Sequence, residues 1–140
     1  RSHSVKKTYV ALVRNWNNSD QESGKIECEM DSHPTERLKW LVVEAGAGKP
    51  SCTNWKILER NKKINNMEAS FIQLSPITGR THQLRVHCTL CGDGILGDSL
   101  YGTPVAGETT DTRLHLHARD LTFPRPGKND DMTVSCLPDW

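Results

Sequence analysis

The chain has 140 residues, which allows one folded domain or a piece of one and excludes a multidomain machine. Hydrophobic residues make up 35% of it, slightly below the share in ordinary globular domains, and the formal net charge is only +1. This composition predicts a folded domain with a thin core. The charge alone gives no sign of a nucleic-acid partner.

The sequence shows no membrane or secretion signal. No apolar run approaches the roughly 20 residues that a membrane helix needs, and the residues from Arg1 onward lack the pattern of a signal peptide. Five cysteines are scattered along the chain: Cys28, Cys52, Cys88, Cys91 and Cys136. An odd, scattered set without a secretion signal favours reduced thiols and an intracellular location, with the compartment left open.

Alternating side chains predict strands in the first half of the chain. Residues 6–13 alternate, so Tyr9 and its neighbours at 11 and 13 should face one way and Val10 the other. Residues 26–30 alternate with one polar face. Further strands are expected at 38–43, 52–59 and 69–74, the last two as a hairpin.

The pattern changes from strand to helix after Gly79. Thr81 is a candidate N-cap, helical spacing follows it, and Gly92 stands where a C-terminal glycine belongs, which predicts a helix of about three turns. A loop is expected at 101–111 and a strand at 114–118.

A last strand at 133–136 is expected to close the sheet. The predicted fold class is α+β, with a mixed, mainly antiparallel sheet and one inserted helix. We treat residues 1–140 as a single domain fragment.

The densest group of polar residues lies at residues 78–87, where two arginines and two histidines surround the predicted helix start. Arg80 and the first helical amides could bind a phosphate, and Arg85, further along the helix, could aim its planar guanidinium at a carboxylate. A solvated first turn with satisfied histidines explains the same residues equally well. The residue pattern leaves both interpretations open.

A zinc site is the weaker interpretation of Cys88 and Cys91. They lie within the predicted helix among apolar neighbours, and no second ligand pair of suitable spacing follows, so packed thiols are expected. His115 and His117 share a strand face but make no site alone. The carboxylates nearest the arginines are expected to serve turns or caps: Asp93, Asp98, Asp111 and Asp120.

Five blocks of sequence follow one another along the chain. The first two are Lys7-Thr8-Tyr9-Val10-Ala11-Leu12-Val13 and Gly48-Lys49-Pro50-Ser51-Cys52-Thr53. The others are Ser75-Pro76-Ile77-Thr78-Gly79-Arg80-Thr81-His82-Gln83-Leu84-Arg85-Val86-His87, Gly94-Ile95-Leu96-Gly97-Asp98 with Tyr101-Gly102, and Arg113-Leu114-His115-Leu116-His117-Ala118. In this order they resemble the C-terminal half of the RluA-type pseudouridine synthases, almost from end to end.

The resemblance implies isomerisation of specific uridines in structured RNA, either tRNA or rRNA, without a metal or cofactor. The base is flipped out, detached from the ribose and reattached through C5. The family's nucleophile is an aspartate in a His-Arg-Leu-Asp motif, and these 140 residues contain no such motif. The expected partner is therefore the N-terminal part of the same catalytic domain, and the chain alone should be inactive.

The resemblance also implies roles for single residues. Tyr9 matches the active-site tyrosine that faces the flipped base, and Arg85 matches the arginine that pairs with the aspartate. Arg80, His82 and Lys49 are expected to contact RNA. The alternatives are a catalytically inactive RNA-binding module of the same fold and, as a weaker one, a small zinc-binding domain.

Overall fold

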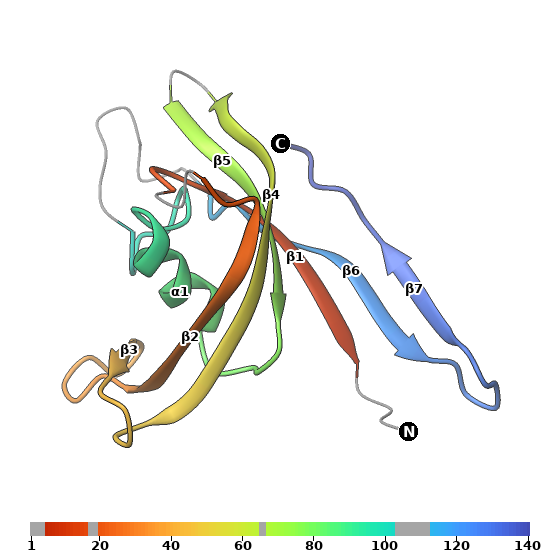
Figure 1. Ribbon diagram of the computed structural model, residues 1–140, viewed down its shortest axis with the longest axis horizontal. Helices are drawn as coiled ribbons and strands as arrows, with labels where there is room; N and C mark the ends of the chain where they lie inside the picture. The colour runs from red at the N-terminus through yellow and green to blue at the C-terminus, as the bar shows by residue number, and fades with distance from the viewer. Residues whose placement is uncertain (1–4, 17–19, 65–66, 103–112) are drawn as a thin grey trace.

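The computed structural model describes residues 5–16, 20–64, 67–102 and 113–140. They form one seven-stranded sheet of order β3-β2-β4-β5-β1-β6-β7, and every neighbouring pair is antiparallel (Figure 1). The elements are β1 (Lys6–Val13), β2 (Ser23–Ser32), β3 (Trp40–Val43), β4 (Lys49–Ile64), β5 (Met67–Pro76), α1 (Gln83–Cys91), β6 (Leu116–Pro124) and β7 (Asp131–Ser135). The predicted α+β class is confirmed.

Strand β1 joins the two parts of the sheet, because it pairs with β5 on one edge and with β6 on the other. Its side chains alternate as predicted. Ala11 and Val13 enter the main core with α1, whereas Leu12 enters a smaller cluster on the opposite face. Both faces of the end of β1 are therefore covered, which makes this strand the anchor of the fold.

The hairpin of β4 and β5 is longer than the predicted strands at 52–59 and 69–74. Strand β4 pairs with β2 through its first part and with β5 along most of its length, with two register shifts in the β5 ladder. Pairing with β5 holds polar residues such as Lys62 and Lys63 in the strand, although the sequence around them lacks the alternation of apolar and polar residues that predicts one.

The helix is shorter at its N-terminus than predicted. Its cap is His82 in the left-handed region at φ 54°, without a capping side-chain hydrogen bond, so the assignment of Thr81 as N-cap was wrong. The Oε1 atom of Gln83 instead accepts the hydroxyl of Thr78 and the backbone N–H of Arg80. Gln83, the first residue of the helix, thus provides the hydrogen-bond acceptor for donors of the preceding loop.

The C-terminal end of α1 agrees with the prediction. The backbone N–H of Gly92 donates to the carbonyl of Cys88 at 3.1 Å. A Cβ at this position would lie 2.7 Å from the carbonyl oxygen of Arg14, so the close approach of β1 requires glycine here.

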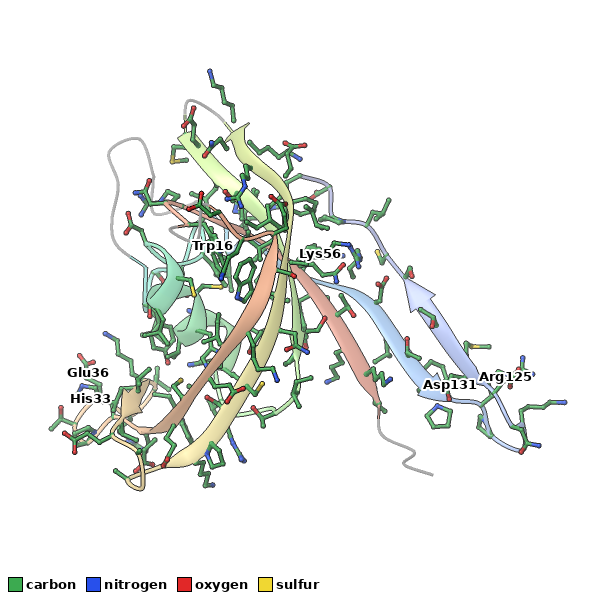
Figure 2. All side chains as sticks on the ribbon, viewed as in Figure 1. Trp16, His33, Glu36, Lys56, Arg125 and Asp131 are labelled. Carbon is green, nitrogen blue, oxygen red and sulfur yellow. The ribbon has the colours of Figure 1, made fainter. Side chains whose placement is uncertain are left out.

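The hairpin of β6 and β7 extends away from α1, and Arg125 and Asp131 mark its far end (Figures 1 and 2). All of β7 is exposed. The strand expected at 114–118 is found as β6, displaced toward the C-terminus, and the one expected at 133–136 overlaps β7. Most of the loop expected at 101–111 lies outside the described residues. Within the described ranges, no helix is long and apolar enough to cross a membrane.

Candidate active site

Arg85 of α1 and Asp98, in the loop that follows the helix, form a two-pronged ion pair. Arg85 donates from Nε to Oδ2 of Asp98 at 3.0 Å and from Nη2 to Oδ1 at 2.7 Å. The side chain of Asp98 is completely buried, whereas that of Arg85 is 21% exposed. This planar fork fixes the direction of the guanidinium.

The loop that carries Asp98 strengthens the pair. Oδ1 also accepts the backbone N–H groups of Leu100 and Tyr101, both at 3.0 Å. Burial by itself would raise the pKa of Asp98, but the hydrogen bonds from Arg85 and from these amides outweigh it and lower the pKa. The bonds to Asp98 raise the pKa of Arg85. Both groups therefore stay charged at neutral pH.

Tyr101 connects this pair to the start of the helix. Its ring lies under the guanidinium of Arg85, with 5.4 Å between Cζ and the ring centroid. Its hydroxyl lies 2.8 Å from Nδ1 of His82 and accepts the backbone N–H of Trp40 at 2.9 Å. Burial is the main cause that lowers the pKa of His82, and the charge of Arg85 adds to it.

The predicted RNA-binding residues Arg80 and Lys49 lie together at the first residues of β4. Arg80 donates from Nε to the carbonyl of Pro50 at 2.9 Å, which ties the loop before α1 to the residue next to Lys49. Lys49 itself is exposed. One edge of Arg80 thus supports the loop, and both residues place positive charge beside the helix start.

A buried chain of polar groups holds α1 on the sheet. Gln83 donates to Oγ1 of Thr53, which lies 2.8 Å from Nδ1 of His87. On the other side of the ring, Nε2 of His87 lies 2.9 Å from Oγ of Ser51, and Ser51 donates to the carbonyl of Cys28. All donors and acceptors are satisfied when His87 is neutral, and burial lowers its pKa to about 4.

Tyr9 lies on the face of the sheet that α1 covers. It is half-buried and packs against the core cluster that contains Leu84 and Cys88 of the helix. The register of the ladder with β6 shifts between Thr8 and Tyr9. The extra residue at this shift is Arg119 of β6, which lies opposite the step from Thr8 to Tyr9.

The five cysteines and the histidines His115 and His117 were the other candidate ligands. Cys88 is fully buried, which raises the pKa of its thiol, and all five cysteines are free thiols. His115 lies within hydrogen-bond distance of the carbonyl of Arg113, and His117 of that of Cys136. Among the described residues, no group of three or more His, Cys, Asp or Glu side chains could hold a metal ion.

The structure therefore groups the predicted site residues in three places: Tyr9 on β1, Arg80 with Lys49 at the start of β4, and His82 with Arg85 around Tyr101. The roles of Asp98 and Tyr101 are absent from the sequence interpretation. Asp98 was expected to serve a turn, which it does, but it is also the carboxylate that Arg85 binds. The residue pattern allowed Arg85 to bind a carboxylate, and the resemblance named an aspartate outside these 140 residues; among the described residues the carboxylate is Asp98.

Comparison with known proteins identifies the family of this chain. The family model described as RNA pseudouridylate synthase matches residues 1–90, which include all five predicted site residues. The chain belongs to this family. The resemblance to the RluA-type enzymes is confirmed by the dual-specificity RNA pseudouridine synthase RluA of Haemophilus influenzae, which is 33% identical over 144 aligned residues and is matched by 100% of this chain.

Two further relatives agree. Ribosomal large subunit pseudouridine synthase D of Neisseria meningitidis is 35% identical, with 99% of this chain and 37% of that protein aligned. The solved structure of human RNA pseudouridylate synthase domain containing 1 has a TM-score of 0.78 and 34% identity over 96% of this chain and 55% of that one. The chain spans 60% of the length of the Haemophilus relative.

Proposed function

We propose that this chain forms the C-terminal part of the catalytic domain of an RNA pseudouridine synthase, which converts specific uridines of tRNA or rRNA. In this proposal the nucleophilic aspartate comes from protein outside these 140 residues. The proposal rests on the family match and on the geometry around Arg85. No metal or cofactor takes part in the proposed reaction.

The observation that carries the proposal is that Asp98 occupies only one edge of the Arg85 guanidinium. Asp98 engages Nε and Nη2, so the edge of the guanidinium that includes Nη1 can bind a second carboxylate. A nucleophilic aspartate held on that edge would stay ionised and oriented while water is excluded. In this proposal Asp98 holds the guanidinium of Arg85 in place, and the nucleophilic aspartate binds the other edge of the same guanidinium.

Tyr9 is proposed to face the flipped base. Its half-buried ring on the helix-covered face offers a surface for stacking, and its phenol can move a proton at C5 of uracil once the base is reattached. Lys49 and Arg80 are proposed to bind phosphates of the RNA, where they would position the strand without reading its sequence.

Release of tritium from RNA labelled at C5 of uridine tests the proposed function. We expect no release by the 140-residue chain alone, and release once a protein also supplies the aspartate-bearing segment. Replacing that aspartate should abolish release. Turnover by the 140-residue chain alone would show that the nucleophile has been misplaced. RNA binding without turnover by the longer protein would support the alternative of an inactive RNA-binding module.

The substitution Arg85→Lys tests the site itself in the longer protein. Lysine keeps the charge but lacks the planar fork, so it cannot bind two carboxylates from fixed edges, and we expect turnover at saturating RNA to fall at least about tenfold, or about 1.4 kcal/mol of barrier. The control is Arg125→Lys in the β6–β7 hairpin, which should turn over normally. Equal rates for Arg85→Lys and the unsubstituted protein would remove Arg85 from the site.

A further inference from the structure

The hydroxyl of Tyr101 has two hydrogen-bond partners, and the available hydrogens determine the donor and the acceptor in each bond. The backbone N–H of Trp40 can only donate, so the Tyr101 oxygen accepts that bond at 2.9 Å. The second partner, 2.8 Å away, is Nδ1 of His82. If Nδ1 carried a hydrogen, the oxygen would accept twice, and the hydroxyl hydrogen would have no partner among the described residues. Both groups are satisfied when Tyr101 donates to Nδ1.

This direction determines the chemical state of His82. A neutral imidazole that accepts at Nδ1 carries its hydrogen on Nε2. Burial and the charge of Arg85 both lower the pKa of His82, against an opposing contribution from Asp98, so the neutral form prevails at neutral pH. Within the described residues Nε2 has no hydrogen-bond partner. The ring therefore presents a single N–H donor.

The ring is also held in one orientation. It packs edge-on against Tyr101, with centroids 5.5 Å apart and an interplanar angle of 75°. The backbone of His82 is left-handed, a conformation that residues other than glycine rarely adopt, so the surrounding structure must hold it there. Tyr101 in turn is held by Asp98, which accepts its backbone N–H and also binds Arg85.

We propose that His82 binds RNA as a neutral donor whose Nε2–H is directed at a phosphate oxygen near the reacting uridine, and that Tyr101 is the positioning residue that fixes this tautomer. This inference rests on the proposed function. A phosphate is the favoured acceptor because Arg80 and Lys49 place positive charge beside the helix start, whereas the charge of Arg85 is balanced by Asp98. Through Asp98 and Tyr101, one loop would then orient both the arginine and the phosphate donor.

The tautomer can be tested without RNA or activity. In ¹⁵N NMR spectra of the 140-residue chain, Nδ1 of His82 should give the signal of an unprotonated nitrogen and Nε2 that of a protonated one. Tyr101→Phe keeps the ring but removes the hydroxyl, so the two tautomers should then interconvert. The signals of the buried His87 serve as the control for intact folding. A His82 hydrogen on Nδ1 in the unsubstituted chain would overturn the inference.

RNA binding tests the role. We expect His82→Ala to weaken binding at least about tenfold, as loss of a hydrogen bond to a charged group does. His82→Gln should retain most of the affinity, because its amide can replace the Nε2 donor. The loss should persist when the target nucleotide lacks its base. Loss only with the base present would point to a base oxygen and overturn the phosphate assignment.

Salt dependence separates a neutral donor from a cation. Plotted as log affinity against log salt, the slope should be the same for His82→Ala and the unsubstituted chain, because a neutral side chain releases no counterion. Lys49→Ala should reduce the slope by roughly 0.7–1. A reduced slope for His82→Ala would show that the histidine binds as a cation. If the longer protein that supplies the aspartate-bearing segment binds RNA as expected here but releases no tritium, the proposed enzyme is refuted but the role of His82 is not.

Discussion

The two ends of the sheet use polar residues differently. Beside α1, polar side chains are buried and linked to one another, as in the chain from Gln83 through Thr53 and His87 to Ser51. In the β6–β7 hairpin, the ion pair of Arg125 and Asp130 lies in solvent, with side chains 37% and 63% exposed. Hydrogen bonds and ion pairs should therefore contribute much to the free energy of unfolding beside α1 and little in the β6–β7 hairpin.

Apolar residues show the same contrast, and two leucines test it with the largest expected effect. Leu74 of β5 is completely buried in the main core, whereas Leu121 of β6 is 39% exposed. Leu74→Ala should lower the free energy of unfolding by roughly 2–5 kcal/mol because it leaves a cavity. Leu121→Ala should cost less than about 1 kcal/mol. Chemical denaturation measures both, and equal losses would refute the division of the sheet into a packed and an open end.

Two aspartates sharpen the comparison for charged groups. Asp98→Asn leaves Arg85 without its carboxylate, and the expected loss of unfolding free energy is about 3 kcal/mol, the lower end for breaking a buried pair, because Arg85 keeps partial access to water. Asp130→Asn removes an exposed partner and should cost at most about 1 kcal/mol. A small loss for Asp98→Asn would mean that the Arg85 pair contributes no more than a surface one.

Protonation of His87 provides a test by pH. Its pKa is about 4 in the folded protein and near 6.5 when unfolded, so below pH 6.5 the unfolded state binds the proton and the folded state does not. The free energy of unfolding should therefore fall by on the order of 2–3 kcal/mol between pH 6.5 and pH 4.

Two substitutions assign that loss of stability to its source. His87→Gln should remove most of this part of the pH profile, although it is less stable at neutral pH. His117→Gln, on β6, should keep the profile of the unsubstituted chain, because His117 lies outside the buried chain of polar groups. A profile unchanged by His87→Gln would show that other groups cause the acid sensitivity.

The sequence was sufficient for features that depend on local pattern. The alternation in β1 predicts the two faces correctly, and Gly92 predicts the end of α1. The helix start was misplaced because a threonine before an apolar repeat is a common N-cap. Here the side chain of Gln83, which is already inside the helix, accepts the hydrogen bonds of the loop instead, and capping rules do not consider that position. The ends of β4 were missed because its pairing with β2 and β5 has no counterpart in local hydrophobicity.

The site shows the same limit. The family blocks contain Arg85, Asp98 and Tyr101, but no local rule states that a carboxylate thirteen positions after Arg85 returns to it. Tyr101 belongs to a block that the resemblance includes, yet its link to His82 spans 19 positions and its link to Trp40 spans 61. Contacts of this range depend on the completed sheet.

The position of β1 also has a consequence for how the chain is made. Its β5 partner lies about 60 residues further along, and its β6 partner, at residues 116–124, lies more than 100 residues further. On a ribosome that adds about 5–20 residues per second, the edge of β1 that β6 will cover stays open for several seconds or longer. Such distant pairing slows folding and leaves the backbone N–H and C=O groups of this edge unpaired and open to other chains. We therefore expect newly made chains to be most prone to aggregation before residue 124 has emerged.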